Sequence, residues 1–212
     1  TIPLGPLFNP GDNNVANDRI TIGLDVVAVN LPANQDGRAL TVAARTFLDG
    51  ALRGQLSHDI LVTEPELEAV IQTIGAPDAP DAADIIGYEV IVRHATSSTA
   101  AAFDADLLVT VDPTLGRLVA TQITSITPEG DATIDTQPVI GGSGSILQGS
   151  FDIPLGGQIA IRYDAVIQQS VARADALQTD AALDWSSLNS APPGERTGDD
   201  GEVGLNDYVS SS

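Results

Sequence analysis

The chain has 212 residues, of which 42% are hydrophobic and only 4% aromatic, and it contains neither Cys nor Met. Asp and Glu total 29 against nine basic residues, all of them Arg, so the formal net charge is −20. This charge argues against nucleic acids and anionic membrane surfaces as partners, because both are themselves anionic. The absence of Cys excludes disulfides and thiol chemistry. No stretch reaches the roughly 18 apolar residues of a membrane-spanning helix, so we expect no membrane insertion.

Apolar and polar residues alternate along most of the chain. The segments with this pattern are, in order, residues 20–29 (ITIGLDVVAV), 64–74 (EPELEAVIQTI), 88–93 (YEVIVR) and 159–164 (IAIRYD). A period of two predicts half-buried strands, and we assign 64–74 to a strand despite its helical composition. Residues 95–102 are the remaining candidate for a turn or two of helix. Gly, Pro, Asn and Asp interrupt these segments about every ten residues, which predicts an all-β sandwich or barrel.

Two parts of the chain resemble each other. Residues 20–29 align with 159–168, residues 39–47 (ALTVAARTF) with 177–185 (LQTDAALDW), and Asp59 to Val62 with Asp207 to Ser210. The spacing is about 140–150 residues, the length of a whole domain and longer than common solenoid periods. We therefore predict that 1–63 is the C-terminal half of one β-sandwich repeat and 64–212 one full repeat, with an acidic C-terminal loop and a linker strand. The abrupt ends suggest a piece of a longer protein.

A half-repeat of about three strands cannot close a sandwich alone. It must pack against the complete domain or pair with strands of a neighbouring repeat or an identical subunit, because an unpaired sheet edge is a template for strand addition.

The chain resembles the tandem conserved repeats of large bacterial surface adhesins, which are related to fimbrial isopeptide-type domains. The stretches that carry the resemblance are residues 84–115, 161–169, 183–188 and 194–208, with Tyr88, Ala102, Asp104 and Asp112 at the family's positions. The resemblance implies immunoglobulin-like β-sandwich repeats of antiparallel Greek-key type. It also implies an extracellular or cell-surface stalk, adhesin or filament without catalytic residues. Two departures are the missing Lys, which removes any isopeptide bond, and Asp112-Pro113-Thr114-Leu115-Gly116 where the family has a different turn.

Acidic loops are the candidate metal sites. Calcium takes six to eight oxygen ligands, and three loops (11–18, 34–37 and 198–207) are dense in Asp, Asn and Gly. The candidate ligands are Asp12, Asn13, Asp18, Asp199, Asp200 and Asp207. The alternative is that Asn, Asp and Gly only form turns through local hydrogen bonds.

Other chemistry has little support in the sequence. His58 and His94 are not at zinc spacing and are expected at the surface or at a strand border. No nucleophile elbow is present, and Gly142-Ser143-Gly144-Ser145 is expected to be a flexible turn. Trp185, the only Trp, is expected in the core, with a sugar-stacking platform as the alternative. We expect a non-enzymatic structural repeat that extends or self-assembles, or alternatively a carbohydrate- or receptor-binding module.

Overall fold

A computed structural model of the chain describes residues 2–3, 5, 11, 21–26, 28–29, 31, 33–112, 116–172, 175–190, 197 and 208–212. These residues form eleven strands and one 3-10 turn, and all neighbouring strands are antiparallel. The elements are β1 (Ala39–Leu48), β2 (Ala51–Leu61), β3 (Leu67–Gly75), β4 (Ile85–His94), β5 (Ala102–Val111), β6 (Leu118–Glu129), β7 (Thr133–Gly141), η1 (Gly142–Gly144), β8 (Ile146–Ile153), β9 (Gln158–Ile167), β10 (Thr179–Ser186) and β11 (Val209–Ser211). Within this part of the chain no helix could cross a membrane.

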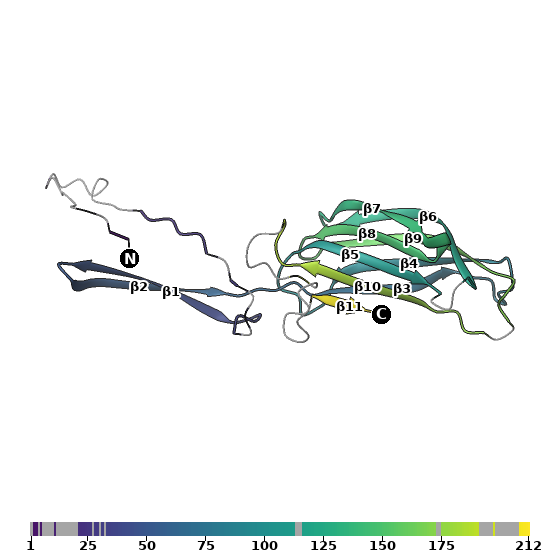
Figure 1. Cartoon of the computed structure of the whole chain (residues 1–212), viewed down its shortest axis with the longest axis horizontal. Helices are drawn as coiled ribbons and strands as arrows, with labels where there is room; N and C mark the ends of the chain where they lie inside the picture. Colours follow the sequence, from purple (N-terminus) through teal and green to yellow (C-terminus); the bar gives the residue numbers. More distant parts are fainter. Residues whose placement is uncertain are drawn as a thin grey trace.

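Strands β3 to β11 form a sandwich of two sheets (Figure 1). One sheet has the order β3-β4-β9-β6, and the other has the order β11-β10-β5-β8-β7. In an immunoglobulin-like domain the first, second, fifth and fourth strands form one sheet, and the other three strands form the second sheet. If the hairpin β7–β8 is left out of the count, β3, β4, β9 and β6 are the strands of the first sheet, and β11, β10 and β5 are those of the second. The hairpin β7–β8 extends the second sheet beyond β5. The all-β, immunoglobulin-like fold expected from the sequence is therefore confirmed.

The alternation in the sequence decides which side chains fill the core between the sheets. Val90 and Val92 of β4 and Ile159, Ile161 and Tyr163 of β9 all point inward and have no exposed surface. Burial of such side chains contributes about 1.5–3 kcal/mol each relative to exposure. The predicted strand at 64–74 is present as β3, which begins at Leu67.

Aromatic residues are few, and four of them form two stacked pairs inside the sandwich. The rings of Tyr88 and Tyr163 stack with centroids 5.3 Å apart, and those of Trp185 and Tyr208 stack at 5.9 Å. Trp185 is 3% exposed, and its indole Nε1 donates a hydrogen bond to the carbonyl of Pro65 at 3.3 Å. The core position predicted for Trp185 is confirmed.

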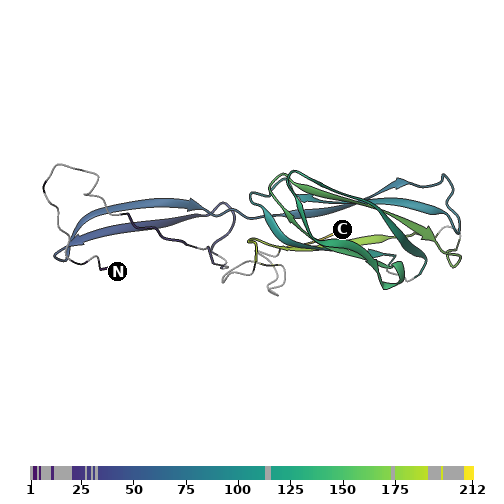
Figure 2. The ribbon, with the colours of Figure 1, turned by 90° about the horizontal axis from the view of Figure 1, so that it is seen from above.

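A hairpin projects from the sandwich as a separate two-stranded sheet. Strands β1 and β2 pair only with each other, and both views show them extending away from the sandwich along the long axis of the molecule (Figures 1 and 2). Residues 62–66 link β2 to β3, and the boundary predicted between residues 63 and 64 falls within this link.

The structure differs from two predictions for local structure. Residues 95–101 form turns instead of helix, because Ser98 and Thr99 use their hydroxyls to accept bonds from the backbone N–H groups of Glu66 and Glu64. Such side-chain bonds compete with helix formation. In the predicted strand 20–29, the described residues (21–26 and 28–29) belong to no ladder and are exposed. They pair with no strand, whereas the aligned strand β9 pairs with β4 and β6.

The two aligned halves of the sequence therefore lie in unlike settings. Strands β1 and β10 also differ in phase, since Val42 faces a groove while its aligned counterpart, Asp180, alternates with buried Ala181. The division into 1–63 and 64–212 as repeat units stays a prediction.

Candidate interaction surface

The projecting hairpin has one apolar and one polar face. Cross-strand pairing puts Leu40 opposite Ile60, Val42 opposite His58 and Ala44 opposite Leu56. We call the five apolar residues of these pairs the apolar face. On the other face, the Thr41 hydroxyl donates to Asp59 at 2.6 Å and the Arg45 Nε donates to Gln55 at 3.0 Å. The hairpin thus has the pattern of a half-buried sheet.

A groove runs along the apolar face near the base of the hairpin. It has a volume of about 270 Å³. The segment 21–29 forms its other wall through Val26 and Ala28, and the full lining is Val26, Ala28, Leu40, Val42, Ile60, Leu61, Val62 and Thr63. Figures 1 and 2 show this segment running beside β1 and β2. The base of the hairpin is therefore partly covered by the same chain.

The tip of the hairpin has no such cover among the described residues. Its large apolar side chains are Phe47, Leu48, Leu52 and Leu56, and they are 60, 59, 53 and 75% exposed. We call these four residues the apolar tip. The strand register puts Leu48 and Leu56 on the apolar face and the pair Phe47 and Leu52 on the other face. Exposed apolar residues of this kind mark interaction surfaces on proteins that are stable in water.

No described residue pairs with the outer edges of the hairpin, whereas two edges of the sandwich are protected. Edge strand β6 contains Pro128 and edge strand β7 contains Pro138, and both strands carry register irregularities. Proline and bulges prevent further strand addition at a sheet edge. Strands β1 and β2 contain no proline and have a single irregularity at Thr46/Phe47. A lone hairpin is marginally stable in water, so these open edges and the apolar face favour a partner.

Polar contacts fix the base of the hairpin to the sandwich. The Asp36 carboxylate accepts a bond from the Thr99 hydroxyl at 2.5 Å and one from the Glu64 N–H at 3.2 Å. Val62, 6% exposed, is held by two backbone bonds, one to Gly37 and one to Arg38. A cavity of about 290 Å³ lies at this junction, lined by Asp36, Glu64, Pro65, Glu66, Leu67, Ser97, Trp185, Tyr208, Val209 and Ser210.

An acidic band crosses the outer face of the second sheet. It comprises Asp104 and Asp106 of β5, Asp135 of β7, Asp152 of β8 and Asp184 of β10. Carboxylate oxygens of Asp104, Asp135 and Asp152 all lie within 4.8 Å of one another, and Asp106 is the cross-strand partner of Asp184. Strands β5, β7, β8, β10 and β11 carry no Arg. Burial and neighbouring carboxylates raise the pKa of Asp106 and Asp135.

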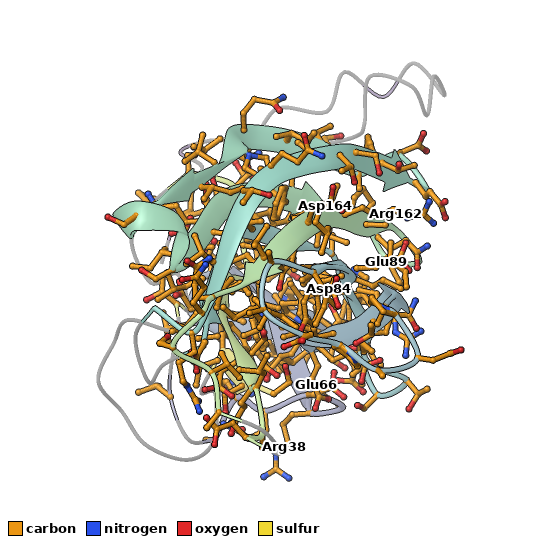
Figure 3. The ribbon with its side chains drawn as sticks, turned by 90° about the vertical axis from the view of Figure 1, so that its right-hand side faces the viewer. Arg38, Glu66, Asp84, Glu89, Arg162 and Asp164 are labelled. Carbon is orange, nitrogen blue, oxygen red and sulfur yellow. The ribbon has the colours of Figure 1, made fainter. Side chains whose placement is uncertain are left out.

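The first sheet presents a different outer face, on which charges are paired. Arg162 of β9 donates to Glu89 of β4 at 2.7 Å, and Figure 3 labels both residues. Arg93 donates to Glu68 at 2.7 Å. The bond from Arg162 is the main cause of the lowered pKa of Glu89. The two faces of the sandwich therefore differ in charge balance.

Replacing Asp135 with Asn should stabilise the sandwich at pH 7. The pKa of Asp135 is raised by burial and then by Asp152 and Asp104, so its charged form is disfavoured in the folded state. Protonated Asp135 therefore favours the folded state below the ordinary pKa of 3.8, and this contribution to the free energy of unfolding is lost as the pH rises through the raised pKa. Because Asp135 is exposed, we expect a gain of at most about 1 kcal/mol.

Thermal melts of the two proteins at pH 7 and pH 4 check this prediction. The advantage of Asp135→Asn should shrink at pH 4 and in high salt. The matched control is Asp180→Asn, which lies on the outer face of β10 but outside the acidic band. An equal gain in both variants would contradict a local repulsion.

The candidate calcium ligands from the sequence lie outside the described residues. Asp12, Asn13, Asp18, Asp199, Asp200 and Asp207 are all in this group, so calcium binding by those loops stays a prediction. The triad Asp104, Asp135 and Asp152 was not predicted, because its members come from three strands and meet only through sheet pairing. The search for acidic loops in the sequence could not identify a cluster whose members lie on separate strands.

Both histidines lie at the predicted kinds of position. His58 is exposed on β2, and His94 ends β4. The His94 Nε2 lies 3.0 Å from the carbonyl oxygens of Ile153 and Pro154, so Nε2 carries the proton and Nδ1 accepts from Ser98 at 2.7 Å. His94 therefore ties the end of β4 to the end of β8. The turn predicted at 142–145 contains η1, and Gly144 within it is buried.

The comparisons with known proteins give a distant likeness only. No family model and no curated protein matches the chain. Among solved structures, it is similar to the RrgB pilus protein from Streptococcus pneumoniae, at 10% identity and a TM-score of 0.36, over 69% of this chain and 29% of that one. It is also similar to the collagen-binding domain from a Staphylococcus aureus adhesin, at 8% identity and a TM-score of 0.34, over 68% and 94%.

A third similar structure is AvmM, described as catalysing macrocyclization in alchivemycin A biosynthesis. Its identity is 8% and its TM-score 0.32, over 80% of this chain and 93% of that one. Pilus and adhesin domains are thus among the structural neighbours. At these TM-scores none of the three carries an argument about function.

Proposed function

We propose that this protein is a structural unit of an extracellular bacterial surface adhesin, stalk or filament, which extends the assembly or joins its copies. The observation that carries the proposal is the hairpin β1–β2. Within the part of the chain that the structure describes, it has an uncovered apolar tip and two open edges, and it is attached to a complete sandwich. A neighbouring unit that supplies strands to this hairpin would complete its sheet and link the two units.

The junction supports a mechanical role. Asp36, Thr99 and Glu64 join the loop before β1, the turn after β4 and the segment before β3. Trp185 adds a bond from β10 to Pro65 in the same segment. A unit held to the hairpin would therefore be coupled to the sandwich through several elements instead of through a single flexible linker.

A carbohydrate-binding role has less support. Its main candidate, Trp185, is 3% exposed and stacks on Tyr208, so its ring offers no platform for a sugar. Binding on a glycan array would restore this alternative. Two further expectations belong to the proposal: the protein has no catalytic activity, and its acidic loops bind calcium. A melting temperature that is unchanged by EDTA would count against the calcium site.

The location of the protein tests the proposal. Antibodies raised against the sandwich should label intact cells that produce the protein, and brief external proteolysis should remove the signal. A cytosolic protein of known location provides the control, since it should stay unlabelled and intact. Recovery of the chain only from the cytosolic fraction would contradict the proposal.

A further inference from the structure

We infer that the hairpin β1–β2 is a self-association site, at which two copies of this chain pack their hairpins antiparallel, tip to base. In this arrangement the apolar tip of each copy occupies the groove at the base of the other. The contact is reciprocal, so it closes as a two-fold dimer. The inference rests on the proposed structural role and names its partner as a second copy.

The first argument is the distribution of charge. Residues 64–212 hold 23 of the 29 acidic residues and only five of the nine Arg, so this part has a net charge of −18. The hairpin (39–61) holds Arg45, Arg53, Asp49 and Asp59 and has a net charge of zero. Two copies therefore repel each other mainly through residues 64–212, and along the neutral hairpin they can meet with little charge penalty.

The second argument is geometry. A ten-residue strand is roughly 33 Å long, and β1 has ten residues. Antiparallel hairpins place the two sandwiches at opposite ends, separated by about this length. The Debye length is about 8 Å at physiological salt, so the acidic sandwiches are screened from each other. A parallel arrangement would instead bring the two sandwiches together.

The third argument is the fit between two apolar features at opposite ends of the hairpin. On the apolar face the tip offers Leu48 and Leu56, which are 59% and 75% exposed. The base offers a groove of about 270 Å³ in which Val42 and Ile60 are 36% and 39% exposed. Among the described residues the tip is uncovered and the groove is only partly covered by Val26 and Ala28, and antiparallel packing covers both at once. A side chain entering the groove would add its burial to that of the groove walls.

Sedimentation velocity on the whole chain over a range of concentrations tests this inference. We expect a monomer–dimer equilibrium with no larger species. Leu56→Asp should weaken the dimer by about tenfold or more, because it puts a charge into an apolar contact. Ser57→Asp is the matched control, since the neighbouring side chain lies on the polar face and should leave the dimer unchanged. Val42→Asp at the groove should act like Leu56→Asp.

Two further measurements separate association from folding. The fluorescence of Trp185 reports the sandwich, and it should be the same in all variants because Trp185 lies outside the hairpin. Amide hydrogen exchange in β1 and β2 should slow as the protein concentration rises, and it should do so only in the proteins that form the dimer. A chain that stays monomeric at several hundred micromolar, with unprotected hairpin amides, would overturn the inference.

The other outcomes are also informative. Open-ended oligomers would overturn the closed two-fold arrangement but agree with the proposed structural role. A monomer that is nevertheless displayed on the cell surface would overturn the second copy as partner and leave the structural role standing. Equal weakening by Leu56→Asp and Ser57→Asp would also contradict the assigned face.

Discussion

Replacing Phe151 with Ala should lower the free energy of unfolding of the sandwich by about 3–5 kcal/mol. Phe151 lies in β8, has no exposed surface and is one of the largest fully buried side chains. Its strand neighbours are Ala105 of β5 and Ile134 of β7. The small Ala105 and the edge position of β7 leave few side chains that could move into the space, so the cavity should persist.

Urea unfolding followed by Trp185 fluorescence measures this loss. The single Trp is buried in β10, which pairs with β5 in the same sheet as β8, so its emission should report the cooperative unfolding of the sandwich. Val139→Ala is the control, because Val139 is 50% exposed on edge strand β7 and should change stability by no more than about 0.5 kcal/mol. A similar loss in both variants would argue that the β7–β8 hairpin, instead of the core, limits stability.

Alternation in the sequence was sufficient to predict the sandwich strands. Tyr88, Val90 and Val92 alternate with polar or less buried positions, and these three face the core. The same reasoning identified β3 despite the helical composition of residues 64–74. Periodicity works for these strands because each one has a sheet neighbour and an opposing sheet, so that inward residues are buried.

The same pattern was misleading in residues 20–29. Leu24 and Val26 alternate with Gly23 and Asp25 as they would in a strand, yet they are 64% and 60% exposed and belong to no ladder. A strand needs a partner to satisfy its backbone, and a sequence pattern does not say whether that partner is present. The resemblance between 20–29 and β9 therefore did not imply an equal environment.

The candidate surface could be predicted only in part. The sequence predicted a half-formed unit with open edges; β1 and β2 form a separate sheet, but the division into repeat halves stays a prediction. The acidic band was not predictable, because it joins Asp104, Asp135 and Asp152 from strands whose order is β5-β8-β7. Their proximity follows from strand order and register, which are set by the whole core and not by any local pattern.

Gly144→Ala should be nearly as damaging as a core truncation, although it adds only a methyl group. Gly144 has φ of +85° and is buried at the end of η1. A Cβ there would lie 2.4 Å from Val119 Cγ1 and 2.5 Å from the Ala120 carbonyl oxygen, both in β6. The side chain of Val119 can rotate, but the carbonyl can move only with the backbone of β6. We expect about 1–3 kcal/mol from the backbone conformation and about 1–3 kcal/mol more from the steric overlap.

Gly156→Ala separates these two contributions, because Gly156 also has φ of +85° but has no atom within 4 Å of an added Cβ. Denaturant unfolding of both variants should show a loss for each, and the larger loss for Gly144→Ala. The difference measures how closely η1 must approach β6, and the adjacent Ser145 carbonyl accepts a bond from Val111 of β5. The turn after β7 therefore contacts both sheets, and its conformation holds the β6–β7 side of the sandwich closed. Equal losses would show that the approach is loose and that only the backbone conformation requires glycine.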